Sequence, residues 1–145
     1  MDLSNEQKFE ILKEAYNEQR KEINFWRERS WKVTTWTIAL QIAVLVANIK
    51  FSSTQLVYIL IPLTALSVMV TMYLHKNYIV YSERWQRLAE VEDALGFFNK
   101  DVYVSGKSLL PESLKNPKIT YKGTRFFIAA VWIMNISIAI VAFVK

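Results

Sequence analysis

Uncharged polar side chains recur at helical spacing inside an apolar stretch near the N-terminus. Thr34, Gln41 and Asn48 are each seven residues apart, and Thr37 falls on the same helical face. Within a membrane, such residues either hydrogen-bond to neighbouring helices or line a water-filled path. The sequence leaves both interpretations open. On the second, these are candidate pore-lining residues, and the pore needs several copies of the chain because three helices supply too few walls.

A second group of residues combines positive charge with an aromatic ring. Arg84, Arg87, Lys100, Tyr103 and Lys107 lie in a region rich in lysine and arginine. Guanidinium and ammonium groups beside aromatic rings can bind phosphates and stack on bases. They are therefore candidate ligand-binding residues. The alternative is the ordinary positive charge that accompanies membrane spans.

Residue types needed for enzymatic chemistry are scarce. The chain has no cysteine and a single histidine, His75. It contains no glycine-rich phosphate loop, no HExxH pattern and no GxSxG elbow. We therefore expect no catalytic residues, no metal site and no cofactor, and predict that the protein is not an enzyme.

Three uncharged stretches dominate the chain of 145 residues, 52% of which are hydrophobic. They cover 33–49, 56–74 and 126–144. A bilayer core of about 30 Å needs about 20 helical residues. The sequence thus predicts an all-α integral membrane protein with three transmembrane helices. Because these stretches hold no charged side chain, a proton-coupled transporter, a pump and a voltage sensor are disfavoured. The alternative is a soluble protein with three buried helices.

Lysine and arginine are distributed unevenly between the connecting segments. Of the 18 such residues, seven lie in 1–32 and nine in 75–125, against Lys50 and Lys145 elsewhere. By the positive-inside rule, the N-terminus and the 75–125 region should be cytoplasmic and the C-terminus outside.

The charged segments flanking the first two spans also have helical character. In 1–32, Ser4 and Gln7 form a possible capping box, and in 75–98, Gly96 is a plausible helix C-cap. Apolar and aromatic side chains recur in steps of three and four along both segments, interrupted by Gln19 in the first and Glu92 in the second. They are Phe9, Leu12, Tyr16, Ile23, Trp26, Tyr78, Tyr81, Trp85, Leu88 and Leu95. We expect a cytoplasmic helical hairpin with a coiled-coil stalk, in which the two seams pair within the chain, between copies, or both.

The segment 99–125 is predicted to be an ordered cytoplasmic loop, because glycines and prolines interrupt it. Within it, 102–104 could form a short strand and 111–114 a short helical turn. Pro62 is expected to kink the second span.

The order of these parts resembles the SLATT-type membrane effectors of bacterial nucleotide-signalling antiphage defence. The resemblance covers about residues 8–98. It is carried by the segments EILKEAYNEQRKEINFWRERSW, before the first span, and HKNYIVYSERWQRLAEVEDAL, after the second. The third span and the 99–125 loop depart from the two-span form.

The resemblance implies a homo-oligomeric pore-forming effector of four or more subunits in the bacterial inner membrane. It also implies that a partner nucleotidyltransferase supplies a nucleotide or oligonucleotide ligand. In Hailong-type systems, one such setting, an oligonucleotide keeps a membrane effector shut. The other interpretation is a non-conducting scaffold that docks a soluble partner through its cytoplasmic helices.

Overall fold

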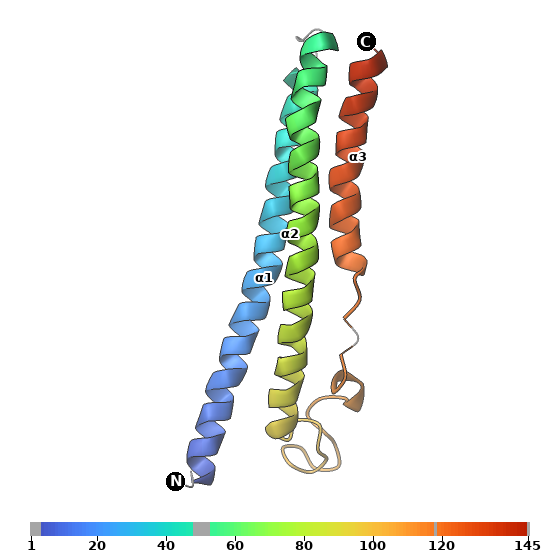
Figure 1. Ribbon diagram of the computed structural model, residues 1–145. Helices are drawn as coiled ribbons and strands as arrows, with labels where there is room; N and C mark the ends of the chain where they lie inside the picture. The colour runs from blue at the N-terminus through green and yellow to red at the C-terminus, as the bar shows by residue number, and fades with distance from the viewer. Residues whose placement is uncertain (1–3, 48–52, 118, 145) are drawn as a thin grey trace. The chain divides into compact units, whose positions relative to one another are not determined.

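The computed structural model describes residues 4–47, 53–117 and 119–144, with backbone only for 53–57 (Figure 1). Its elements are α1 (Asn5–Ala47), α2 (Ser53–Ala94), the 3-10 helix η2 (Glu112–Leu114) and α3 (Lys122–Val144). The three α-helices are each long and apolar enough to cross a membrane. The described residues form no strand, which confirms the all-helical prediction.

Local signals set both of the helix ends that the sequence identified. The Ser4 amide donates to Gln7 Oε1 (3.0 Å) and the Gln7 amide donates to Ser4 Oγ (3.2 Å), so the predicted capping box is confirmed. At the other end, Gly96 has φ +76°. The Gly96 amide donates to the Asp93 carbonyl (2.9 Å), and the Phe97 amide to the Glu92 carbonyl (3.0 Å). These bonds form a Schellman cap, which confirms Gly96 as the C-cap residue.

The loop differs in detail from its prediction. In place of a strand at 102–104, the structure has one isolated bridge between Val104 and Lys107. The predicted helical turn is present as η2. The loop also ends earlier than 125, because α3 begins at Lys122. Only the apolar part of a helix has to match the bilayer, so a charged first turn can precede the uncharged stretch.

The early start of α3 brings Tyr121 against α2. Its hydroxyl lies 3.1 Å from His75 Nδ1, and its ring lies 4.6 Å from the ring of Tyr78. The only histidine of the chain is therefore in contact with the segment that leads into α3. Elsewhere, α2 continues as one helix through Pro62.

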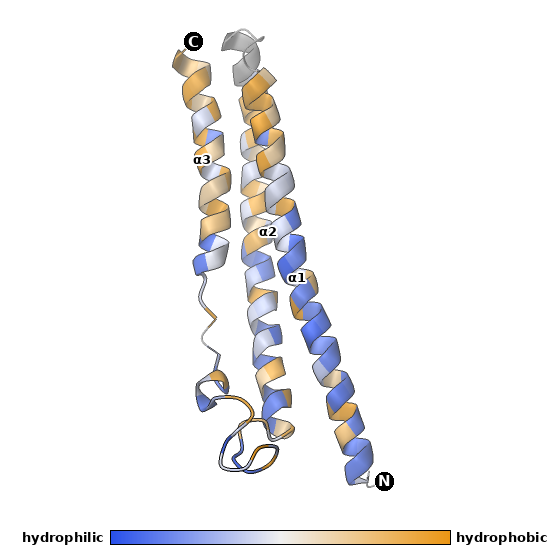
Figure 2. Ribbon diagram, turned by 180° about the vertical axis from the view of Figure 1, so that it is seen from behind, coloured by the Kyte–Doolittle hydropathy of each residue, from blue (hydrophilic) through white to orange (hydrophobic). Residues whose placement is uncertain are grey.

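The chain divides into two compact units, and α1 and α2 each contribute a segment to both. We call Met1–Arg27 with Ile79–Ile119 the charged unit, and Glu28–Tyr78 with Thr120–Lys145 the apolar unit. Figure 2 shows the hydrophilic residues concentrated in the first and the hydrophobic residues in the second.

In the apolar unit, segments of α1, α2 and α3 lie side by side (Figure 1). Its core is centred on Leu74 and Val131, which are 1% and 0% exposed, together with Val70. Val33 and Phe127 pack against this cluster, so all three helices contribute to it.

In the charged unit, the seam residues of α1 and α2 are partly or fully buried, except Phe9, which is 47% exposed. Ile23 of α1 and Leu88 of α2 are buried. Arg84 Nε lies 2.8 Å from Glu22 Oε2, which joins the two helices of the same chain. This ion pair joins α1 and α2 within one chain, whereas the coiled-coil pairing of the seams, within the chain or between copies, stays a prediction.

Candidate functional site

The first predicted pore-lining residues lie inside the apolar unit. Thr34 and Thr37 are 3% and 6% exposed. Their hydroxyls donate to the Ser30 and Val33 carbonyls, at 2.9 and 2.8 Å, one turn back along α1. Each hydroxyl thus has a hydrogen-bond acceptor within its own helix. Burying it against the other helices therefore costs little free energy.

Gln41 joins all three helices of the apolar unit. It is fully buried, and its Nε2 donates to Ser67 Oγ on α2 (3.2 Å) and to the Val131 carbonyl on α3 (3.1 Å). The carbonyl can only accept, so the amide nitrogen must face it. Ser67 in turn donates to the Leu63 carbonyl (3.0 Å), which leaves its lone pairs free to accept from Gln41.

Two further hydrogen bonds between α2 and α3 lie about one turn to either side of Gln41. Trp132 Nε1 donates to Thr71 Oγ1 (3.0 Å), and Asn135 Nδ2 donates to Thr64 Oγ1 (3.2 Å). We call this set of residues the polar ladder: Gln41, Thr64, Ser67, Thr71, Trp132 and Asn135. It supplies the helix–helix hydrogen bonds that the sequence pattern allowed as one of its two interpretations.

The polar ladder is not fully satisfied by protein groups. Gln41 Oε1 and Asn135 Oδ1 are both buried, and no donor among the described residues reaches either oxygen. A buried acceptor without a donor costs about 1–3 kcal/mol.

The remaining pore-lining candidate, Asn48, lies outside the described residues. Of the polar ladder, only Gln41 was among the candidates. The other five members were not: Thr64, Ser67, Thr71, Trp132 and Asn135. A signal for Trp132 was available, because a buried indole N–H within an apolar span needs an acceptor.

The two arginine candidates have different surroundings. Arg84 is paired with Glu22, and its side chain is 28% exposed. Arg87 lies on the exposed surface of α2 and makes no ion pair with a described residue. Of the two, only Arg87 is free to meet an anion without first breaking a protein contact.

The lysine candidates come together in the loop that follows α2. Lys100 and Lys107 line one open cavity of about 390 Å³ together with Gly106, Ser108, Leu109 and Pro111. Neither lysine forms an ion pair within the described part of the chain. Two lysines and a serine are thus among the lining residues, and ammonium and hydroxyl groups are groups that bind phosphate.

The backbone of this loop is held by local hydrogen bonds. Asp101, at φ 64°, accepts at Oδ1 from the Gly106 amide (2.6 Å). The Tyr103 hydroxyl donates to the Leu95 carbonyl (2.6 Å), and its ring meets that of Phe97 with centroids 5.5 Å apart. Tyr103 is therefore used to anchor the loop, and it does not line the cavity.

Comparison with known proteins adds no relative to this description. No family model matches the chain, and neither a curated protein nor a solved structure matches it significantly.

Proposed function

We propose that this protein is an oligomeric membrane effector that forms an ion-conducting pore. A nucleotide or oligonucleotide made by a partner nucleotidyltransferase would gate it from the cytoplasm. The setting would be the bacterial inner membrane during antiphage defence, where opening depolarises the infected cell. The charged unit and the N-terminus would face the cytoplasm, in line with the positions of lysine and arginine.

The observation that carries the pore is the polar ladder. A column of amide, hydroxyl and indole groups runs through a unit whose spans hold no charged side chain. The unsatisfied oxygens of Gln41 and Asn135 make the closed packing less stable. Separation of the helices would let water donate hydrogen bonds to these oxygens. The open, hydrated packing would then recover part of the free energy that burying them costs.

The ligand is proposed to bind through its phosphates at the cavity of Lys100 and Lys107. A volume of about 390 Å³ falls within the range of small-molecule sites, about 300–1,000 Å³. The phosphate contacts would come from the two lysines and from the Ser108 hydroxyl. A ligand shifts the gate only as far as its affinities for the closed and open forms differ.

Ion flux from liposomes tests the pore. Purified protein is reconstituted, and flux is measured alone and with cyclic dinucleotides or short linear oligonucleotides. Gln41→Leu should lower flux at least tenfold, because it replaces the central amide by an apolar side chain of similar size. Thr35→Val is the matched control, since Thr35 is an exposed residue of α1 outside the ladder.

The same assay separates the ligand site from the pore. Lys100→Gln with Lys107→Gln should remove the response to nucleotide and leave flux without ligand unchanged. Lys8→Gln, at an exposed position on α1, is the control. An absence of flux under every ligand condition would contradict the proposal.

A second function is favoured by the complete burial of Gln41 within a single chain. On this alternative, the ladder only binds helices together, and the protein is a non-conducting scaffold that docks a soluble partner through the charged unit. Expression would then leave the membrane potential unchanged, and a stable complex with that partner would be isolated.

A further inference from the structure

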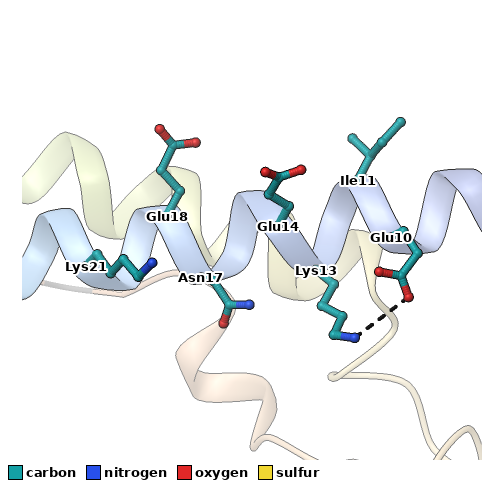
Figure 3. Close-up of a pocket in the computed structure, with 7 residues that line it drawn as sticks. All are labelled: Glu10, Ile11, Lys13, Glu14, Asn17, Glu18 and Lys21. Carbon is teal, nitrogen blue, oxygen red and sulfur yellow. Dashed lines mark ion pairs between the residues drawn. The ribbon is translucent and has the colours of Figure 1, made fainter.

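One face of α1 in the charged unit is exposed to solvent. It consists of exposed residues that border an open space of about 550 Å³ along a single helix: Glu10, Ile11, Lys13, Glu14, Asn17, Glu18 and Lys21. We call this set the outer face of α1 (Figure 3). At 100° per residue it lies opposite Leu12, Tyr16 and Ile23 of the seam.

Charges of both signs lie on the outer face. Figure 3 shows Glu14 and Glu18 on one edge and Lys13 on the other, with Lys21 between the two edges. Lys13 and Glu10 are 3.7 Å apart, and both side chains are mostly exposed. Glu14, Glu18 and Lys21 make no ion pair with any described residue. The face thus has an acidic edge, formed by Glu14 and Glu18. Lys13 and Lys21 lie beyond this edge, and Glu10 lies beside Lys13.

The charges of the outer face indicate which class of molecule it can bind. Three carboxylates against two ammonium groups oppose binding to nucleic acid or to anionic headgroups. The same pattern is complementary to itself. Copies inserted in one membrane share one orientation, because the distribution of lysine and arginine is the same in each. Neighbouring copies of α1 therefore run parallel.

In a parallel arrangement, the acidic edge of one copy and the lysines of the next lie at similar positions along the helix axis. Glu14 and Lys13 of adjacent copies differ by one residue, about 1.5 Å along the axis, and Glu18 and Lys21 by about 4.5 Å. We propose that the outer face of α1 is the surface through which copies of this chain associate. The acidic edge of one copy meets the Lys13/Lys21 side of the next.

This contact is heterologous, because two different sides of the face meet. Every copy therefore uses both sides, and a ring of copies can close. Exposed ion pairs contribute little affinity. The outer face therefore determines mainly the register between neighbouring α1 helices and the choice of partner, as charged flanking positions do in coiled coils. The inference rests on the proposed oligomer, for which it names the contact surface in the charged unit.

Charge reversal in detergent at low salt tests the surface. Glu14→Lys with Glu18→Lys places like charges at the contact, as does Lys13→Glu with Lys21→Glu. Either pair should weaken association about tenfold. The variant carrying all four changes should recover the wild-type mass, because complementarity returns. Failure of the fourfold variant to recover, with both pairs impaired, would overturn the inference.

Crosslinking provides a second test, because the chain has no cysteine of its own. Asn17→Cys with Glu18→Cys puts one thiol on each side of the face, and oxidation should yield multimers larger than dimers. Either single variant should stay uncrosslinked, whereas a two-fold contact would give dimers. Lys8→Cys with Phe9→Cys, away from the outer face, is the control.

The outcomes separate this inference from the proposed function. A wild-type protein that is oligomeric and conducts, but whose mass is unchanged by either charge reversal, overturns the surface and leaves the function standing. A monomeric wild-type protein without flux overturns both.

Discussion

The charged unit and the apolar unit hold α1 and α2 together by different interactions. In the charged unit, Arg84 and Glu22 form an ion pair at 2.8 Å. In the apolar unit, Gln41 and Ser67 form a hydrogen bond between neutral groups at 3.2 Å. The same two helices thus change the chemistry of their contact along their length.

The difference follows from the surroundings that each unit is suited to. In water, a partly exposed ion pair costs little to form and contributes little. In a bilayer, a charge is expensive, whereas an amide or a hydroxyl can be satisfied by a neighbouring helix. Side chains that remain unsatisfied in the apolar unit, such as Asn135, are therefore the exceptions that point to function.

The largest expected effect separates the two units directly. Gln41→Ala removes both interhelical hydrogen bonds and leaves a cavity, so we expect the apolar unit to lose about 2 kcal/mol. Hydrogen exchange, resolved by peptide in lipid nanodiscs, should rise around Ser67 and Val131 and stay constant around Leu88. Thr35→Ala is the control, and an equal rise in both variants would contradict a special role for Gln41.

A smaller effect is expected for the cap of α2 in the charged unit. Gly96→Ala forces a side chain into the left-handed region, which costs about 1 kcal/mol. The added Cβ would lie 3.5 Å from Asn99 Nδ2, an ordinary contact, so the cost comes from the backbone. Exchange should rise near the end of α2. Gly123→Ala, at a helical position with open space and no positive φ, should leave exchange near the end of α2 unchanged.

The ion pair of the charged unit should respond to salt, and the polar ladder should not. A double-mutant cycle with Arg84→Gln and Glu22→Gln is expected to give about 0.5 kcal/mol at low ionic strength. At about 1 M salt the screening length falls to about 3 Å, and the coupling should shrink. A cycle with Gln41→Leu and Ser67→Ala should give the same coupling at both salt concentrations. A salt-independent Arg84–Glu22 coupling would remove this distinction between the units.

The smallest effect concerns Glu92 on the seam of α2. Burial raises the pKa of Glu92 above its ordinary value of 4.5, and the nearby Arg20 opposes this by less. A carboxyl with a raised pKa in the folded state binds its proton more tightly there than in the unfolded chain. The contribution of Glu92 to the stability of the charged unit is therefore fully present below pH 4.5 and is lost as pH rises through the folded pKa.

Glu92→Gln tests this sign, because glutamine resembles the protonated form and does not titrate. The variant should unfold at a slightly higher temperature than wild type at neutral pH. The difference should vanish at acidic pH. Thermal unfolding followed by circular dichroism between pH 4 and 8 measures it, and a wild type that is the more stable protein at neutral pH would refute the expectation.

Much of the fold could be predicted because its signals are local. The three spans follow from length and the absence of charge, and the Ser4–Gln7 cap and the Gly96 C-cap follow from neighbouring residues. The start of α3 at Lys122 was missed because hydropathy marks only the part of a helix that suits the lipid core.

The candidate site was only partly predictable. Lys100 and Lys107 share a cavity because the turn between them brings them together. Arg84 forms an ion pair with Glu22, a residue far away in the chain, so no rule of local spacing could predict the pairing. The polar face of Gln41 was visible in the sequence, whereas its contacts were not.

By itself, the sequence determined which stretches suit lipid, which suit water, and where capping residues begin or end a helix. These properties depend on residue type and on neighbours within one or two turns. Only the tertiary structure decided that Gln41 meets Ser67 and Val131, which lie 26 and 90 residues away. Those contacts depend on the rotation and register of three packed helices, and the periodicity of a single helix carries no information about either.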